Sequence, residues 1–132
     1  MKKSYKGYIV WMILFCVGMV VMMIVDFKNL KLFSLILGNY MFITLSLLTG
    51  MIYKNEAIYW YSGMSYQEAI EATSMSRKKY AYKHFIRFFI TCLLYLFYSI
   101  IAYFLSFSFG MNMTICYLLI MVCALSTTSI KL

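Results

Sequence analysis

Side chains able to catalyse a reaction or to hold a metal ion are few in this chain and lie far apart in the sequence. His84 is the only histidine, and it has no carboxylate or cysteine near it at a spacing typical of a metal site or a nucleophile and its base. The sequence also lacks a Ser/His/Asp set, a CxxC pattern and a glycine-rich phosphate loop. The four cysteines all lie within apolar stretches: Cys16, Cys92, Cys116 and Cys123. We therefore expect no enzymatic activity, no metal site and no cofactor on this chain.

The stretches that carry these residues are strongly apolar. Hydrophobic residues make up 64% of the sequence and charged residues 12%, and a chain of this composition would not stay soluble as a monomer. A helix needs about 20 apolar residues to cross the hydrocarbon of a membrane. The sequence has four such spans, close to residues 8–25, 32–53, 85–107 and 111–130. The expected fold class is all-α, a single polytopic membrane domain of residues 1–132 with four transmembrane helices and one sizeable loop, residues 54–84.

The basic residues indicate how the spans are oriented. Of the twelve lysines and arginines, only Lys28 and Lys31 lie in the first short turn, and the second turn has none. The others lie on the side of the two termini and the long loop: Lys2, Lys3, Lys6, Lys54, Arg77, Lys78, Lys79, Lys83, Arg87 and Lys131. The excess of basic residues on cytoplasmic segments predicts that both termini and the loop are cytoplasmic, an N-in/C-in arrangement.

The net charge of +8 also bears on partners and location. Because the basic residues flank apolar spans, anionic lipid headgroups are the expected partner and nucleic acid is not. The sequence is rich in Lys, Ile, Met and Tyr and has no proline, a composition that fits an AT-rich bacterial genome. We expect a multi-pass protein of the bacterial cytoplasmic membrane.

Polar residues inside the spans are rare. An ion-coupled transporter would need a charged residue near the middle of a span, and none of the spans has one. We interpret Asp26 as a turn residue at the membrane interface. We expect Asn39 to hydrogen-bond a neighbouring helix, with a polar path as the alternative. The hydroxyls of residues 126–129 are expected to bond back to the preceding turn, with an aqueous path as the alternative. Ser46 and Gly50 have the small-xxx-small spacing of a helix face that packs on another helix.

The segment SYQEAIEATSMSRKKY, Ser65–Tyr80, is the part of the chain best suited to contact a partner in water. Ser65 and Glu68 form a capping-box pattern, which predicts a helix that begins at Ser65. We expect this helix to run to about Ser76 and to close in the basic residues 77–79, with positive charge at its C-terminal end. A surface helix that only joins two spans is the alternative. The less polar residues at helical spacing on one face are Tyr66, Ala69, Ile70 and Thr73.

The ending of this segment resembles a loop of the membrane subunits of type-2 ABC exporters. Small permeases of that class show the pattern Y-x-x-x-x-S-x-G-x-(S/T)-R-K-x-(F/Y) directly before a span, and Ser76, Arg77, Lys78 and Tyr80 fall on its ending. Ser74 stands at or near the place of the glycine. In that class, the loop between the second and third spans forms a coupling helix that sits in a groove of a separate ATPase subunit.

The resemblance implies that Mg-ATP would be bound by that partner subunit alone. Since such permeases usually have six spans, a chain with four would be a reduced permease, half of a split one or an accessory subunit, working as a homo- or hetero-oligomer that exports a peptide, lipid or drug-like substrate. The residues expected to contact the ATPase are Ser65, Tyr66, Glu68, Ala69, Ile70, Glu71 and Thr73. Those expected to anchor the helix end at the membrane surface are Arg77, Lys78, Lys79 and Tyr80.

Two other classes of membrane protein remain open. A non-transporting protein, such as a bacteriocin-immunity protein or a regulatory or accessory subunit, needs only spans and a cytoplasmic contact surface. A small multidrug-type transporter has a similar length and four spans, but its proton coupling normally depends on a glutamate in the first span. Residues 8–25 contain no acidic residue, which disfavours that class.

Overall fold

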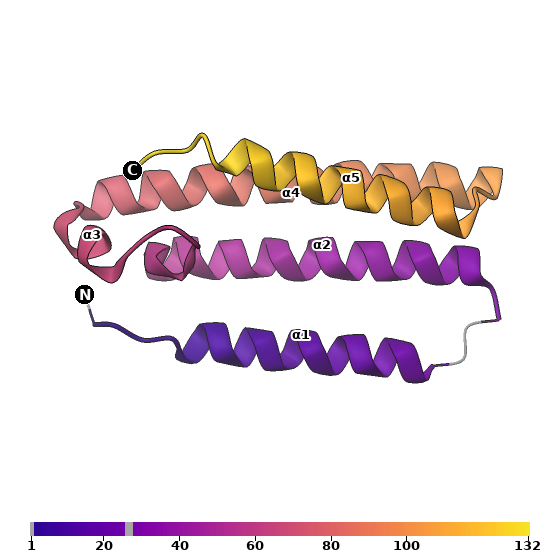
Figure 1. Ribbon diagram of the computed structural model, residues 1–132, viewed down its shortest axis with the longest axis horizontal. Coiled ribbons are helices and arrows are strands. Elements are labelled where there is room, and N and C mark those ends of the chain that lie inside the picture. The colour runs from indigo at the N-terminus through magenta and orange to yellow at the C-terminus, as the bar shows by residue number, and fades with distance from the viewer. Residues whose placement is uncertain (1, 26–27) are drawn as a thin grey trace.

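Four long helices lie side by side in the computed structural model of the protein, which describes residues 2–25 and 28–132 (Figure 1). They are α1 (Lys6–Ile24), α2 (Leu30–Asn55), α4 (Ser74–Leu105) and α5 (Phe109–Thr127). Each is long and apolar enough to cross a membrane. The prediction of an all-helical chain with four such helices is thereby confirmed, whereas Asp26 lies outside the described residues.

The two ends of the bundle differ. Both chain termini lie at one end, together with the short helices η1 (Ile58–Trp60) and α3 (Tyr66–Glu71); we call this the loop end (Figure 1). The end of α1, the start of α2 and the connection from α4 to α5 lie at the opposite end, which we call the turn end. Helix α4 begins at Ser74, well before the predicted start of the third span near residue 85. Residues 74–84 of the predicted loop are therefore the first turns of a 32-residue helix.

The most extensive interface joins α2 and α4, and small residues of α2 allow the close approach. Gly38 faces the ring of Tyr95, which is fully buried. Ser46 donates a hydrogen bond to the carbonyl oxygen of Phe88, at 3.3 Å, and Gly50 also faces α4. The predicted packing face of the second span is confirmed, and the helix that it contacts belongs to the same chain.

Polar groups within the bundle are satisfied mostly by neighbouring helices or by their own helix. The Asn39 Nδ2 atom donates to Ser99 Oγ on α4 and to the carbonyl oxygen of Leu35, both at 2.8 Å. The hydroxyls of residues 126–129 donate to carbonyl oxygens three residues earlier, at 2.6–2.8 Å. Both patterns confirm the packing interpretation of these residues.

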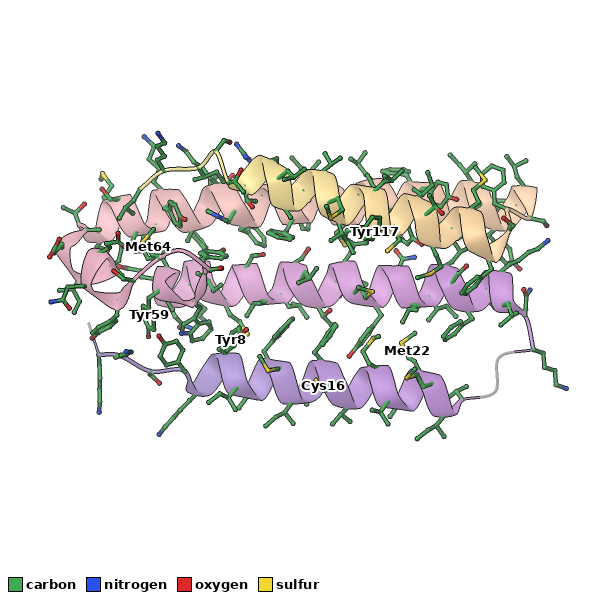
Figure 2. The ribbon with its side chains drawn as sticks, viewed as in Figure 1. Tyr8, Cys16, Met22, Tyr59, Met64 and Tyr117 are labelled. Carbon is green, nitrogen blue, oxygen red and sulfur yellow. The ribbon has the colours of Figure 1, made fainter. Side chains whose placement is uncertain are left out.

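Helix α1 is the least buried of the four, and it contacts mainly α2. One aromatic stripe mediates the contact, and Figure 2 shows Tyr8 and Met22 reaching from α1 toward α2. The Trp11 Nε1 atom donates to the carbonyl oxygen of Thr44 at 2.8 Å, and the rings of Phe15 and Tyr40 are stacked. The rest of α1 is left open to lipid or to another protein.

Candidate functional site

The candidate site is the loop end, where α3 lies between the end of α2 and the start of α4. Its first turn is fixed by a reciprocal pair of hydrogen bonds: the Glu68 N–H donates to Ser65 Oγ at 3.1 Å, and the Ser65 N–H donates to Glu68 Oε2 at 2.8 Å. The backbone hydrogen bond from Ser65 is the main cause that lowers the pKa of the Glu68 carboxyl. The predicted capping box is confirmed, and α3 starts where the sequence placed it.

The end of α3 differs from the prediction. The helix stops at Glu71, because Ala72 is extended and Thr73 caps a new helix by accepting from the Ser76 N–H at 3.2 Å. The prediction of one helix from Ser65 to about Ser76 was wrong. The physical reason is that α4 must turn to lie along α2, and an uninterrupted helix would carry the chain away from the bundle.

The break also moves the basic residues 77–79 to a different helix. They lie in the first turns of α4, near its N-terminus, where the helix dipole disfavours positive charge. Glu56, the residue that ends α2, offsets this charge: its Oε1 atom lies 3.6 Å from Lys78 Nζ, and its Oε2 atom lies 2.9 Å from Arg77 Nη2. The predicted placement of this charge at the C-terminal end of the loop helix is therefore corrected.

Arg77 ties three helices together. Its Nε atom donates to Glu56 Oε2 at 3.0 Å, while its Nη1 atom donates to the carbonyl oxygens of Ala69, at 3.2 Å, and Ala72. These carbonyls are at the C-terminal end of α3, where the helix itself provides no donor. The end of α2, the end of α3 and the start of α4 are thus joined through one guanidinium, a feature that we call the Arg77 junction.

The Glu56 carboxylate is held from both sides of the same junction. Ser74, the first residue of α4, donates from its Oγ atom to Glu56 Oε1 at 2.7 Å. This hydrogen bond is the main cause that lowers the pKa of Glu56, and hydrogen bonding and charge attraction from Arg77 add to it. Both partners of the ion pair are largely shielded from solvent, with 14% of the Arg77 side chain and 20% of the Glu56 side chain exposed. Removing one partner of an ion pair this shielded costs more stability than removing one from an open surface, because the other charge is left partly buried without a partner.

The two faces of α3 are clearly different. Ala69 is fully buried in a cluster with residues of α2, η1 and α4, and Tyr66 packs edge-on against Tyr59 with ring centroids 5.1 Å apart. On the opposite side, Ile70 is 46% exposed and Glu71 is exposed. We call the exposed side chains of residues 65–71 the outer face of α3. This face combines one apolar side chain with carboxylates and an amide.

Of the residues predicted from the resemblance, the structure buries some and leaves others exposed. Ala69 cannot reach a partner because it is fully buried, and Thr73 serves as the cap of α4. Among the predicted membrane anchors, Arg77 is engaged in the junction and Tyr80 is buried with 8% exposed. The side chains of these two predicted anchors therefore pack inside the loop end. The predicted residues that are exposed are Ser65, Glu68, Ile70, Glu71, Thr73, Lys78 and Lys79.

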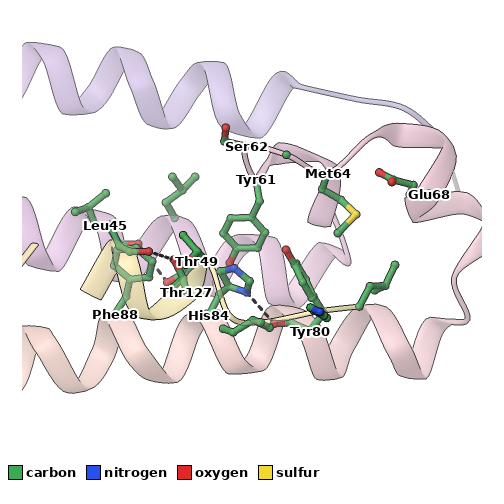
Figure 3. A pocket seen from close by; sticks show the side chains of 17 residues that line it. Leu45, Thr49, Tyr61, Ser62, Met64, Glu68, Tyr80, His84, Phe88 and Thr127 are labelled. Atoms are coloured by element: carbon green, nitrogen blue, oxygen red, sulfur yellow. Dashed lines mark hydrogen bonds between the residues drawn. The ribbon is translucent and has the colours of Figure 1, made fainter. Parts of the chain in front are cut away.

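A cavity of about 770 Å³ lies beside α3, between α2, α4 and the segment that follows α5 (Figure 3). Its centre is formed by His84, whose ring is stacked on that of Tyr61 with centroids 4.2 Å apart. The Nδ1 atom of His84 lies 3.1 Å from the carbonyl oxygen of Tyr80, one helical turn earlier. His84 is 5% exposed. Its contacts are those of a packed side chain.

Sequence reasoning missed Glu56 and Ser74, which hold the junction. Glu56 is one of only four acidic residues and follows a predicted span, which was a signal that it pairs with a basic group. Its partners are 18 and 21 residues away, and only the turn between α3 and α4 brings them together. Across residues 2–25 and 28–132, no group of three His, Cys, Asp or Glu side chains is close enough to hold a metal ion.

Comparisons with known proteins give no further guide. No family model matches the chain, and no curated protein or solved structure matches it. The function is therefore argued from the geometry of the loop end.

Proposed function

We propose that the chain is the membrane subunit of an ABC-type transporter, and that α3 is the helix through which a separate ATPase subunit acts on it. The Arg77 junction is the observation that carries this proposal. A helix of six residues has little stability of its own in water. Here the capping box fixes its first turn, and Arg77 fixes its last carbonyls to two long helices.

This arrangement suits the transfer of movement. A push on the outer face of α3 would be passed through Ala69, packed in the core, and through Arg77 to the ends of α2 and α4. Both are long helices, of 26 and 32 residues, and they share the largest interface of the bundle. A displacement at the loop end would thus be carried along the two helices toward the turn end.

The outer face of α3 fits a partner with a basic, partly apolar groove. Glu68 and Glu71 offer carboxylates for charge pairing. Ile70 is 46% exposed, so burial of its remaining apolar surface would gain about half of the 1.5–3 kcal/mol expected for a fully exposed side chain. The ATP chemistry would belong to the partner. The proposal includes an N-in/C-in arrangement in the bacterial cytoplasmic membrane, because the ATPase must meet α3 in the cytoplasm.

Copurification from native membranes tests the proposal. The tagged chain, extracted in mild detergent, should bring down a protein with a phosphate-binding Walker A loop. Ile70→Asp and Glu71→Lys should each weaken this recovery at least tenfold, since both change the outer face of α3. Met75→Asp is the matched control, because Met75 is 81% exposed but lies on α4, beyond the outer face.

The opposite result has an equally clear meaning. If the wild-type chain recovers no such ATPase, or if the α3 variants recover it as well as Met75→Asp does, the coupling role is refuted. A non-transporting immunity or accessory protein would then be the better description.

A further inference from the structure

A second pocket lies at the loop end and shares Tyr80, Lys131 and Leu132 with the cavity of His84. Residues of α4 and of the segment after α5 enclose a pocket of about 300 Å³, at the lower end of the range for small-ligand sites. Three lysines line it, together with two hydroxyl-bearing residues and the last residue of the sequence: Ser76, Lys79, Tyr80, Lys83, Lys131 and Leu132. We propose that this lysine pocket binds the phosphate group of an anionic phospholipid.

The convergence of the three lysines depends on the fold. Lys79 and Lys83 are four residues apart on α4, so they lie on the same face of the helix. Lys131 comes from a segment far away in the sequence and is held nearby because Ile130 is buried in the core of the loop end. Arg87 fixes the same segment by donating hydrogen bonds to the Ser126 carbonyl oxygen and to Ser129 Oγ.

The charge of this pocket is not neutralised within the part of the chain that the structure describes. No acidic residue lines the pocket, and the ion pairs of the described residues involve Glu56 with Arg77 and Lys78 only. Glu68 lines the neighbouring cavity and is not among the residues that line this pocket. Three ammonium groups that line one pocket with no acidic side chain among them repel one another, and a bound anion would reduce this repulsion.

The depth of the pocket favours a lipid as the source of the anion. The far end of α4 is at the turn end, where Lys31 Nζ contacts the carbonyl oxygen of Ser106 at 3.3 Å. A hydrocarbon layer of about 30 Å, measured from there at 1.5 Å per residue, ends near Ile86. Lys83 then lies about 5 Å and Lys79 about 10 Å beyond the hydrocarbon. The lipid phosphates lie in this range of depths.

The surface below the pocket suits an acyl chain. Ile86 and Ile90 are three and seven residues after Lys83, so they continue the same face of α4 into the hydrocarbon. Ile90 is 50% exposed. A phosphate in the lysine pocket would thus have an open apolar strip directly beneath it, which a soluble phosphate compound would leave unused.

Native mass spectrometry of the full chain in mild detergent tests this assignment without any ATPase. Dioleoyl phosphatidylglycerol should form a retained adduct in preference to dioleoyl phosphatidylcholine. Lys83→Gln combined with Lys131→Gln should weaken that adduct roughly thirtyfold, about fivefold for each basic residue near the membrane surface. Lys2→Gln with Lys54→Gln is the matched control, because it removes the same charge from the same end outside the pocket.

Further variants and a competition experiment test whether binding is specific to the lysine pocket and whether a lipid supplies the phosphate group. The double substitution Lys83→Arg and Lys131→Arg should retain the adduct, since both positive charges are kept. Equal loss in the pocket variant and the control would overturn the site, because net charge alone would then explain binding. Displacement of phosphatidylglycerol by glycerol 3-phosphate at equal concentration would overturn the lipid assignment in favour of a soluble phosphate compound.

Discussion

Removing the guanidinium of Arg77 should loosen the loop end far more than removing any exposed lysine beside it. Arg77→Gln takes away the hydrogen bond and the ion pair with Glu56 and the donor for the carbonyl oxygens of Ala69 and Ala72. Exposed ion pairs contribute about 0–1 kcal/mol, whereas breaking a buried pair costs about 3–5 kcal/mol. With 14% and 20% of the two side chains exposed, we expect a loss of about 2–3 kcal/mol in the free energy of unfolding.

A double-mutant cycle with Glu56→Gln separates the ion pair from the bonds to α3. The coupling energy between the two positions should be about 1–2 kcal/mol, and Arg77→Gln should still be destabilising in the Glu56→Gln background because the bonds to the α3 carbonyls are lost as well. The assay is reversible unfolding in mixed micelles with increasing dodecyl sulfate. Fluorescence of Trp60, which lies in η1 at the same end, reports the transition.

The pH dependence of this cycle is fixed by the lowered pKa of Glu56. Because the pKa in the folded protein is below the ordinary value of 4.5, the carboxylate contributes its full stability above about that pH. This contribution is lost as the pH falls through the folded pKa, so the difference between wild type and Glu56→Gln should shrink as the pH falls below about 4.5. Lys79→Gln, whose side chain is exposed, is the control and should change stability by less than about 0.5 kcal/mol. Equal effects of Arg77→Gln and Lys79→Gln, or a coupling energy near zero, would refute the reasoning.

Three glycine substitutions probe how the helices pack. Gly38→Ala should cost about 1–3 kcal/mol, because the new Cβ would lie 2.4 Å from atoms of the fully buried Tyr95 ring; equal thermal stability in detergent would contradict this. Gly18→Ala should shift α1 away from α2, because its Cβ would lie 1.9 Å from Tyr40 Oη, and cross-linking between α1 and α2 should fall while helix content stays constant. Gly110→Ala is expected to leave stability unchanged or raised by up to about 1 kcal/mol, since nothing lies within 4 Å of the new Cβ and alanine favours the helix; a loss of stability there would show that α5 packs differently.

The sequence predicted well those features that depend on local chemistry or on length. The four long helices follow from apolar runs that are long enough to cross hydrocarbon. The capping box of Ser65 and Glu68 follows from a spacing of three residues. The hydrogen bond from Asn39 to a neighbouring helix follows from the cost of leaving an amide unpaired in lipid, although its partner Ser99 could not be named.

The features that sequence reasoning missed depend on the turn between α3 and α4. Residues 65–76 have one continuous helical pattern, so the interruption at Ala72 is decided by the need of α4 to pack along α2. The same turn brings Arg77 back to Glu56, and no local spacing indicates that pairing. This is why Arg77 was assigned to the membrane surface, while its side chain lies inside the loop end.

The most direct test of the account is site-specific photocrosslinking in intact native membranes. A photoreactive amino acid at position 70 would lie on the outer face of α3, and one at position 75 would lie on α4, where Met75 is highly exposed. Position 70 should crosslink to a protein with a Walker A loop, in an amount that changes when ATP is added, and position 75 should not. Crosslinking of both positions to lipid alone, or equal crosslinking of both to the same protein, would contradict the claim that α3 is the helix on which an ATPase acts.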